Sequence, residues 1–253
     1  MAKKHIWLVA GLVWLAALPA AAATADEYAN VHTIGIVSTV GGEFVVKRLG
    51  TMVFGNSETK LPIPSWGIDA WLTDAIAKAL SPRFAVKTIA APGGIAGCEE
   101  IEDCIAQLPP DPSIDAYLLV RETSFYARGG NLDAHAIGLY QADNPFGDDL
   151  NTLHTLYMVQ VVDAKSGKVI DYGTAKLPET VFLGDHPYPM KPIKPALLAN
   201  SDARLSAAQL ESLRPQVMEL LQRSYRRALI AAGLLPEEAD ETSDATRGSS
   251  PAH

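Results

Sequence analysis

The sequence predicts a single α/β domain built on a mixed sheet, with a parallel core, a late antiparallel hairpin and helices packed on the sheet. Strand-like and helix-like segments alternate between residues 32 and 121, which is typical of parallel strands joined by right-handed crossovers. Two β-rich segments then flank a glycine turn before residue 175, and this pattern predicts the hairpin. An apolar stripe of helical period follows between residues 206 and 232.

The first 25 residues have the composition of an export signal. Lys3 and Lys4 precede the thirteen uncharged residues Ile6–Leu18, and Ala23-Thr24-Ala25 supplies an A-x-A cleavage pattern. A helix of thirteen residues is only about 20 Å long, short of the roughly 30 Å hydrocarbon core of a membrane. We expect a signal peptide over residues 1–25, cleaved before Asp26, and a soluble chain in the periplasm of a Gram-negative cell.

The first elements of the domain are short strands followed by a helix. Three β-rich segments predict strands: His32–Thr39, Glu43–Arg48 and Thr51–Phe54. Asn56–Pro64 is predicted to be a loop. Ser65 is placed to cap a helix whose apolar residues repeat at i, i+3, i+4 and i+7 as far as Leu80.

The middle of the chain supplies the crossover to a buried strand. Arg83–Ala90 is predicted to be a strand, and Glu99–Leu108 a short helix with acidic residues in its first turn, where the helix dipole favours them. Ser113–Arg121 is a nearly continuous apolar run, as expected of a strand buried on both faces. His135–Tyr140 is predicted to be a further strand.

The hairpin and the last helix carry the clearest local signals. Thr155–Val162 and Lys168–Ala175 flank a turn in which Gly167 can take the left-handed conformation. Ser206 and Gln209 form a capping box at the start of the helix, which ends before Gly233. Pro215 either kinks this helix or restarts it. The acidic segment over residues 236–253 is predicted to be a disordered tail, so the domain spans residues 26–235.

The two cysteines present two competing arguments. Cys98 and Cys104 stand alone in a chain bound for an oxidising compartment, which favours a disulfide. On one continuous helix their Cα atoms would lie about 9 Å apart, beyond the roughly 7 Å limit for bridging, unless Gly97 lets the first cysteine leave the helix. We expect the bridge to form. The C-x5-C spacing does not match the C-x-x-C pattern of redox-active pairs.

Composition and motifs assign no cofactor, metal or catalytic residue. The 21 basic residues less Lys3 and Lys4 leave 19 against 29 acidic ones, a net charge of −10, which disfavours binding to nucleic acid or anionic membranes. No histidine pairs with another at metal-binding spacing, although His135 and His154 can meet in the fold. No G-x-S-x-G motif is present. Gly93–Gly97 and Asp143–Asp149 are interpreted as turns rather than as phosphate or calcium sites.

Three segments carry a family resemblance: the opening HTIGIVSTVGGEF, the buried SIDAYLLV and the hairpin VVDAKSGKVIDYG. In the order of their elements they resemble the α/β domains of bacterial envelope proteins related to the TolB amino-terminal domain, the curli secretion lipoprotein and the lipoprotein activators of peptidoglycan synthases. The resemblance spans residues 30–235. Two of these groups are lipidated at an amino-terminal cysteine that this chain lacks, so it does not imply membrane attachment. It implies a non-catalytic domain that binds other envelope proteins, without shared catalytic residues to transfer.

The segment Lys176–Asn200 is the candidate for partner contact. It contains five prolines and no periodicity, together with Phe182 and Tyr188, whose rings offer rigid apolar area. Either these rings pin the segment under the sheet or they face an envelope partner. The sequence therefore predicts a periplasmic interaction or assembly module with an unknown partner. The alternatives are an envelope hydrolase whose site forms only in three dimensions and a soluble binder of a small ligand.

Overall fold

The computed structural model describes residues 27–50, 55–91, 98, 100–126, 133–142, 150–177, 188–194 and 205–237. The predicted signal peptide, the predicted strand Thr51–Phe54 and the tail beyond residue 237 lie outside these ranges. The predicted turns at Gly93–Gly97 and Asp143–Asp149 lie outside them as well.

The first sheet has the mixed topology that the sequence predicts. In its parallel part, β1 (Thr33–Ser38) lies between β4 (Ala85–Thr88), which forms one edge, and β5 (Ala116–Glu122), and is parallel to both. The hairpin of β10 (Tyr157–Asp163) and β11 (Val169–Thr174) continues the sheet antiparallel to β5, with β11 at the edge. The parallel core and the late hairpin are thereby confirmed.

A second five-stranded sheet continues the layer. Its order is β12 (Met190–Pro192), β9 (Leu150–Thr155), β8 (Ile137–Ala142), β2 (Glu43–Leu49) and β3 (Ser57–Pro62). The prediction of a loop over residues 56–64 is therefore wrong. The sequence of β3, SETKLP, is polar because β3 is an exposed edge strand, so it lacks the apolar signal on which strand prediction relies.

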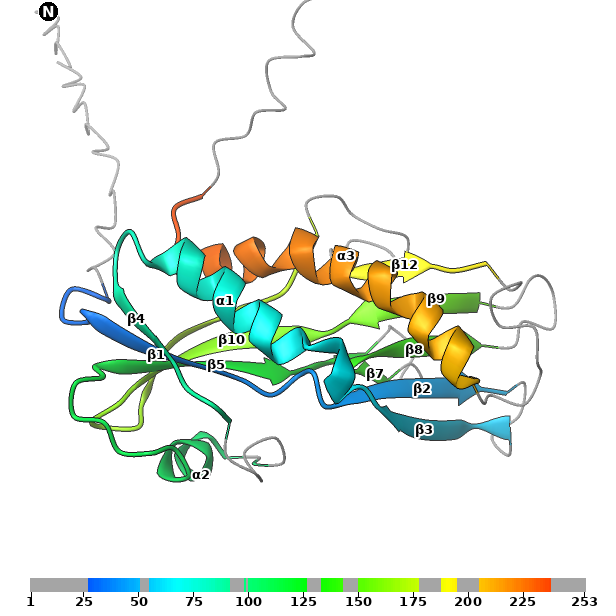
Figure 1. Cartoon of the computed structure of the whole chain (residues 1–253), viewed down its shortest axis with the longest axis horizontal. Coiled ribbons are helices and arrows are strands. Elements are labelled where there is room, and N and C mark those ends of the chain that lie inside the picture. The colour runs from blue at the N-terminus through cyan, green and yellow to red at the C-terminus, as the bar shows by residue number, and fades with distance from the viewer. Residues whose placement is uncertain are drawn as a thin grey trace, which may run out of the picture.

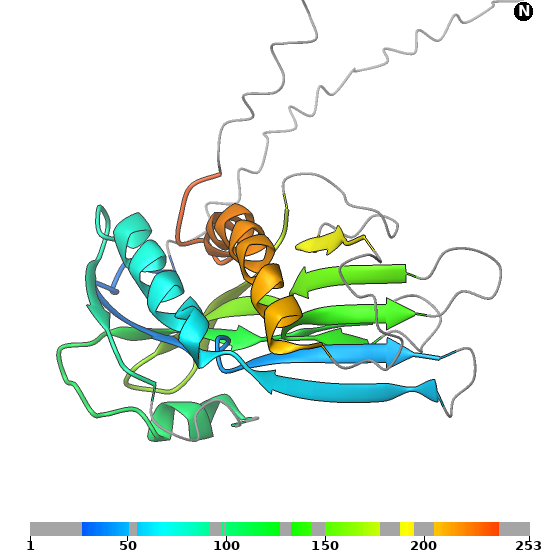
Figure 2. The same ribbon diagram turned by 45° about the vertical axis from the view of Figure 1, so that its right-hand side comes forward.

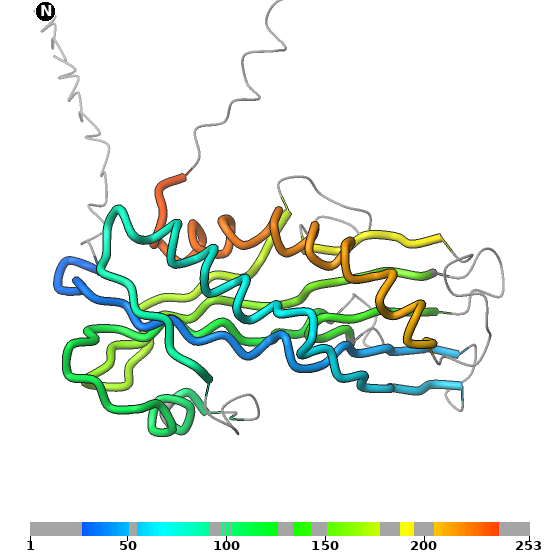
Figure 3. The backbone as a smooth tube through the Cα atoms, in the orientation of Figure 1, coloured from blue at the N-terminus to red at the C-terminus, as the bar shows by residue number. Residues whose placement is uncertain are grey.

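The two sheets join where three strands change partners. Thr123 donates its backbone N–H to Leu156, Leu156 donates to Ala136, and Ala136 donates to Thr123, at 3.1, 2.7 and 3.1 Å. Ala136 has a φ of 58°, which breaks the predicted strand His135–Tyr140 into β7 (Asp133–His135) and β8. A two-stranded ribbon of β6 (Ser124–Tyr126) and β7 leaves the layer at this point. Figure 3 shows the chain running from β1 directly into β2, from one sheet to the next.

Two helices cover one face of both sheets. Figures 1 and 2 show α1 (Ile68–Leu80) and α3 (Ala207–Ala231) side by side above the strands, while α2 (Ile101–Ala106) lies below them at one end. The main core fills the space between the two upper helices and the strands. Large fully buried side chains come from both sheets and from α1, including Phe44, Ile34, Ile36, Leu118, Leu139, Leu72 and Ile76.

Of the two predicted helix caps, the one at the start of α3 is present and the one at the start of α1 is absent. The Ser206–Gln209 capping box is present at the start of α3, which then passes through Pro215 as one helix without restarting. Ser65 does not cap α1. It lies in a 3₁₀ turn over Pro64–Trp66, and Gly67 with a φ of 65° follows as the N-cap residue, without a side-chain capping bond. The left-handed backbone at Gly67 ends the turn and redirects the chain into α1.

The backbone of α3 rests directly on β11 at Gly173. A Cβ atom at this position would overlap the carbonyl oxygen of Ala228 and lie 2.7 Å from the backbone nitrogen of Ala232. Two buried hydrogen bonds hold the helix nearby, from the Tyr28 hydroxyl to the Ala232 carbonyl oxygen at 2.6 Å and between the Tyr157 and Ser224 hydroxyls at 2.9 Å. The close approach of helix and strand therefore requires glycine at position 173.

We expect Gly173→Ala to lower the free energy of unfolding by about 2–3 kcal/mol, because the added methyl group pushes α3 away from the sheet. Gly42→Ala is the matched control, since nothing lies within 4 Å of a Cβ atom there. The control is expected to change stability by about 0.5 kcal/mol or less. Urea unfolding followed by circular dichroism measures both, and equal stabilities of the two variants would contradict the packing described.

Candidate functional site

The face of the first sheet opposite α1 and α3 is only partly covered. The cluster around α2 buries Val37, Leu119 and Val162 on this face. Beyond it, Gln160 lies opposite both Leu119 and Tyr172, and Met158 lies opposite Arg121. Val169 and Tyr172 on β11 are 40% and 59% exposed and are the exposed large apolar side chains of the described residues. We call Met158, Gln160, Val169 and Tyr172 the β10–β11 surface.

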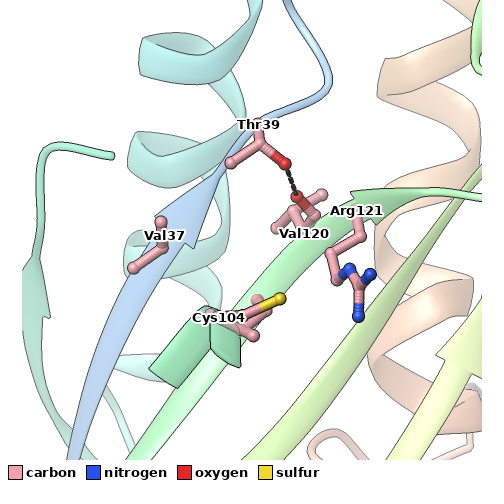
Figure 4. A pocket seen from close by; sticks show the side chains of 6 residues that line it. Val37, Thr39, Cys104, Val120 and Arg121 are labelled. Atoms are coloured by element: carbon pink, nitrogen blue, oxygen red, sulfur yellow. Dashed lines mark hydrogen bonds between the residues drawn. The ribbon is translucent and has the colours of Figure 1, made fainter. Parts of the chain in front are cut away.

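A small hollow lies between this surface and α2, at the carboxyl ends of β1 and β5 (Figure 4). Its cavity volume is about 10 Å³, and it is lined by Val37, Thr39, Cys104, Leu119, Val120 and Arg121. Because β4 and β5 lie on opposite sides of β1, this is the position where open α/β sheets bind ligands. The hollow is smaller than the roughly 300–1,000 Å³ typical of ligand pockets.

The polar groups of the hollow are engaged with the protein. The Thr39 hydroxyl donates to the Val120 carbonyl oxygen at 3.3 Å. The Arg121 guanidinium donates to the carbonyl oxygen of Cys98 at 2.8 Å and to Oε1 of Gln160 at 3.5 Å. Arg121 thus connects the segment that precedes α2 to the β10–β11 surface.

Cys98 and Cys104 are joined by a disulfide, with their Cα atoms 5.5 Å apart. The predicted helix Glu99–Leu108 is shorter than expected, because α2 begins at Ile101. Cys98 therefore precedes the helix and can approach Cys104, which is fully buried in the cluster around α2. The expected Cα separation of about 9 Å applied to a continuous helix containing both cysteines, and that helix does not form.

We expect Cys98→Ser, and separately Cys104→Ser, to lower the free energy of unfolding by about 2 kcal/mol, the loop-closure entropy of so short a ring. Alkylation under denaturing, non-reducing conditions is expected to find no free thiol in the oxidised wild-type protein. Adding reductant to the wild type should reproduce the loss of stability and leave the serine variants unchanged. An unchanged melting temperature in Cys98→Ser would contradict a stabilising bridge.

A group of polar side chains is buried on the outer face of the second sheet. Tyr140 on β8 lies opposite Thr152 on β9, and Gly138 lies opposite His154 in the next row. The Tyr140 hydroxyl, the Thr152 hydroxyl and Nδ1 of His154 have no hydrogen-bond partner of ordinary geometry within the described residues. Nε2 of His154 lies 3.1 Å from the carbonyl oxygen of His135. Because a carbonyl oxygen only accepts, Nε2 is the nitrogen that donates in this hydrogen bond.

The pKa of His154 is lowered to about 4, and burial of the ring is the largest cause. The backbone of His135 and of Thr152 opposes the shift, and the charges of His135 and Lys47 add to it. Burial also raises the pKa of Tyr140 to about 12. Both side chains are therefore uncharged at neutral pH.

We expect stability to fall as the pH is lowered from about 6.5 to about 4, because the unfolded state takes up a proton on His154 before the folded state does. The contribution of His154 to the free energy of unfolding is fully present above its pKa in the unfolded chain. The contribution lost below its pKa in the folded protein is about 3 kcal/mol. His154→Gln should flatten this part of the profile, whereas a His32→Gln control, at an exposed ring, should keep it. The measurement is urea unfolding at a series of pH values. A His154→Gln profile that remains parallel to the wild type would contradict the assignment.

The remaining predicted residues lie apart from the β10–β11 surface. Tyr188 packs its ring against Phe125, with the centroids 4.7 Å apart, in the cluster beneath the β6–β7 ribbon. Phe182 lies outside the described residues, and contact of either ring with a partner stays a prediction. Nε2 of His135 lies 3.3 Å from the Glu58 carboxylate, and His135 lies opposite Ser124 in the ribbon. No group of three or more His, Cys, Asp or Glu within the described ranges is placed to hold a metal ion.

No protein-family model and no curated protein matches this sequence. Solved structures similar to it include protein XCC0632 of Xanthomonas campestris, from family DUF330, with a TM-score of 0.34 and 9% identity over 81% of this chain and 84% of that one. Lipoprotein GNA1162 of Neisseria meningitidis has a TM-score of 0.27 and 13% identity over 76% and 98%. The hypothetical protein CT253 of Chlamydia trachomatis has a TM-score of 0.23 and 10% identity over 77% and 98%.

These similarities are too low to assign the chain to a family. The resemblance to the TolB, curli secretion and synthase-activator domains does not rest on them and stays a prediction. Among the helices that the structure describes, none has both the length and the apolar character to cross a membrane.

Proposed function

We propose that this chain is an exported protein of the bacterial cell envelope that acts as a non-catalytic interaction or assembly module, with the β10–β11 surface as its contact. Exposure of Tyr172 and Val169 side by side on one edge strand is the observation that carries the proposal. Exposed aromatic side chains on a rigid element supply contact area at low entropic cost and are typical of binding hot spots.

Export is supported by two independent features. The amino-terminal sequence has the three regions of a cleavable signal, and the folded chain carries a disulfide between its two cysteines, which persists in oxidising compartments. The acidic net charge and the family resemblance both favour protein partners over nucleic acid.

One observation favours a second candidate, an envelope hydrolase. His135 contacts the Glu58 carboxylate and lies opposite Ser124, so a nucleophile, a base and an orienting acid occupy one region of the surface. Directly opposite residues in an antiparallel pair have Cβ atoms about 5 Å apart, which is within reach for such a triad. Labelling of Ser124 by a fluorophosphonate would identify this activity, and Ser124→Ala would abolish the label.

We expect a photo-crosslinking aromatic amino acid at position 172 to capture one defined envelope protein in intact cells, and the same residue in place of the exposed Lys78 on α1 to capture none. Tyr172→Ser should change stability by about 0.5 kcal/mol or less, because the ring is largely exposed, and should abolish capture from a neighbouring probe at position 169. Mass spectrometry identifies the captured protein. Identical products at positions 78 and 172 would refute the proposed surface.

A further inference from the structure

The outward side of β11 presents backbone groups that no strand in the described part of the chain pairs with. Ala175 donates to Tyr157, so in this antiparallel ladder the alternate residues Gly173 and Asp171 also face β10. The register shifts at Ile170, and beyond this bulge Asp163 donates to Lys168, so the backbone groups of Val169 and Thr174 point away from the sheet. Between them, the outward N–H of Tyr172 donates to Oδ1 of Asp171 at 2.7 Å.

The other sheet edges carry charges that are already paired. On β3, Glu58 lies 3.9 Å from Lys47, and Lys60 lies 3.4 Å from Glu43. On β4, Lys87 forms an ion pair with Asp111 at 2.7 Å. Charged side chains along an edge strand protect it against the addition of another strand. β11 instead combines open backbone groups with exposed apolar side chains.

Exposed lysines mark both ends of this edge. Lys168 precedes β11 and Lys176 follows it, and the described residues provide neither with an ion pair. The order along the edge is thus basic, apolar and basic, in a chain whose net charge is strongly acidic. Such an edge is complementary to an extended segment with acidic ends.

A second copy of the chain fits this edge poorly. Antiparallel self-pairing centred on Tyr172 would set Lys168 opposite the other copy's Lys176, and like charges opposite one another are destabilising. The chain's own tail, residues 238–253, is acidic but has no aromatic or branched aliphatic residue to lie against Tyr172 and Val169.

We infer that β11 is the docking edge for an extended segment of a partner protein that adds as a strand, with alternating apolar side chains between acidic ends. This inference rests on the proposed interaction function and specifies its partner. The partner segment receives backbone hydrogen bonds from Val169 and Thr174, packs its apolar side chains along Val169 and Tyr172, and places its acidic ends beside the two lysines.

The test uses the full exported chain and two synthetic nine-residue peptides in which valine and threonine alternate, one with terminal aspartates and one with terminal lysines. NMR is expected to show that the aspartate peptide slows amide hydrogen exchange at Val169 and Thr174 and leaves the Gly173 amide, already paired with β10, unchanged. We expect the aspartate peptide to bind about tenfold more tightly than the lysine peptide, from two charge pairs at the rim. Lys168→Glu combined with Lys176→Glu should reverse this preference.

Thr174→Pro is the blocking variant, because proline removes an outward N–H that β10 does not use and is tolerated at an edge. It should abolish peptide binding with an unchanged circular dichroism spectrum. Equal binding of both peptides, or no protection at Val169 and Thr174, would overturn the inference. Protection of these amides without peptide would overturn it too, and would point to a second copy if it depends on protein concentration and to the chain's own tail if it does not. Capture at position 172 that persists in Thr174→Pro would leave the interaction function standing and exclude strand addition.

Discussion

The closed set of three backbone hydrogen bonds among Thr123, Ala136 and Leu156 is the constraint on which the rest of the fold depends. Each of these residues lies at a break between two strands, and each donates to one of the others and accepts from the third. Without these bonds, buried N–H and carbonyl groups at the break would lose their partners, at a cost of about 1–3 kcal/mol each. That cost outweighs the roughly 1–2 kcal/mol of placing Ala136 in the left-handed region. The junction therefore keeps two sheets in one layer, so that α1 and α3 can cover both with a single core.

The same layer is covered unevenly on its other face. The disulfide-bonded α2 protects one end of the first sheet, and the β6–β7 ribbon protects part of the second, where Phe125 and Tyr188 pack over Tyr140. Burial beneath the ribbon keeps His154 uncharged and holds the polar side chains around it away from solvent. The hairpin edge lies outside both covers, so Tyr172 remains exposed beside partly buried neighbours. The buried polar side chains around His154 and the exposed ring of Tyr172 thus lie on the same face of the layer, on either side of the junction between the sheets.

Local signals predicted those elements whose cause is local. The turn at Gly167, the capping box at Ser206 and the apolar run of β5 appear where the sequence placed them. β9, with the sequence LNTLHT, is buried by its neighbours on both sides and has no apolar pattern of its own, so strand order had to be known first. The sequence predicted the hairpin that carries Tyr172. The exposure of Tyr172 could not be predicted, because only the strand order reveals that β11 is an edge strand and that Gly173 lies beneath α3.

The disulfide and the proposed contact surface belong to one continuous set of interactions. Oxidation fixes Cys98 against α2, and the Cys98 carbonyl oxygen then accepts from Arg121. The same guanidinium donates to Gln160, which lies opposite Tyr172 in the sheet. Cys98, held by the disulfide, thereby orders the side chains next to the exposed ring through Arg121. Ordering a surface before binding reduces the entropy lost on association. If the protein is exported as proposed, disulfide formation in an oxidising compartment also prepares the contact surface, because Cys98 contacts Arg121, and Arg121 contacts Gln160 opposite Tyr172.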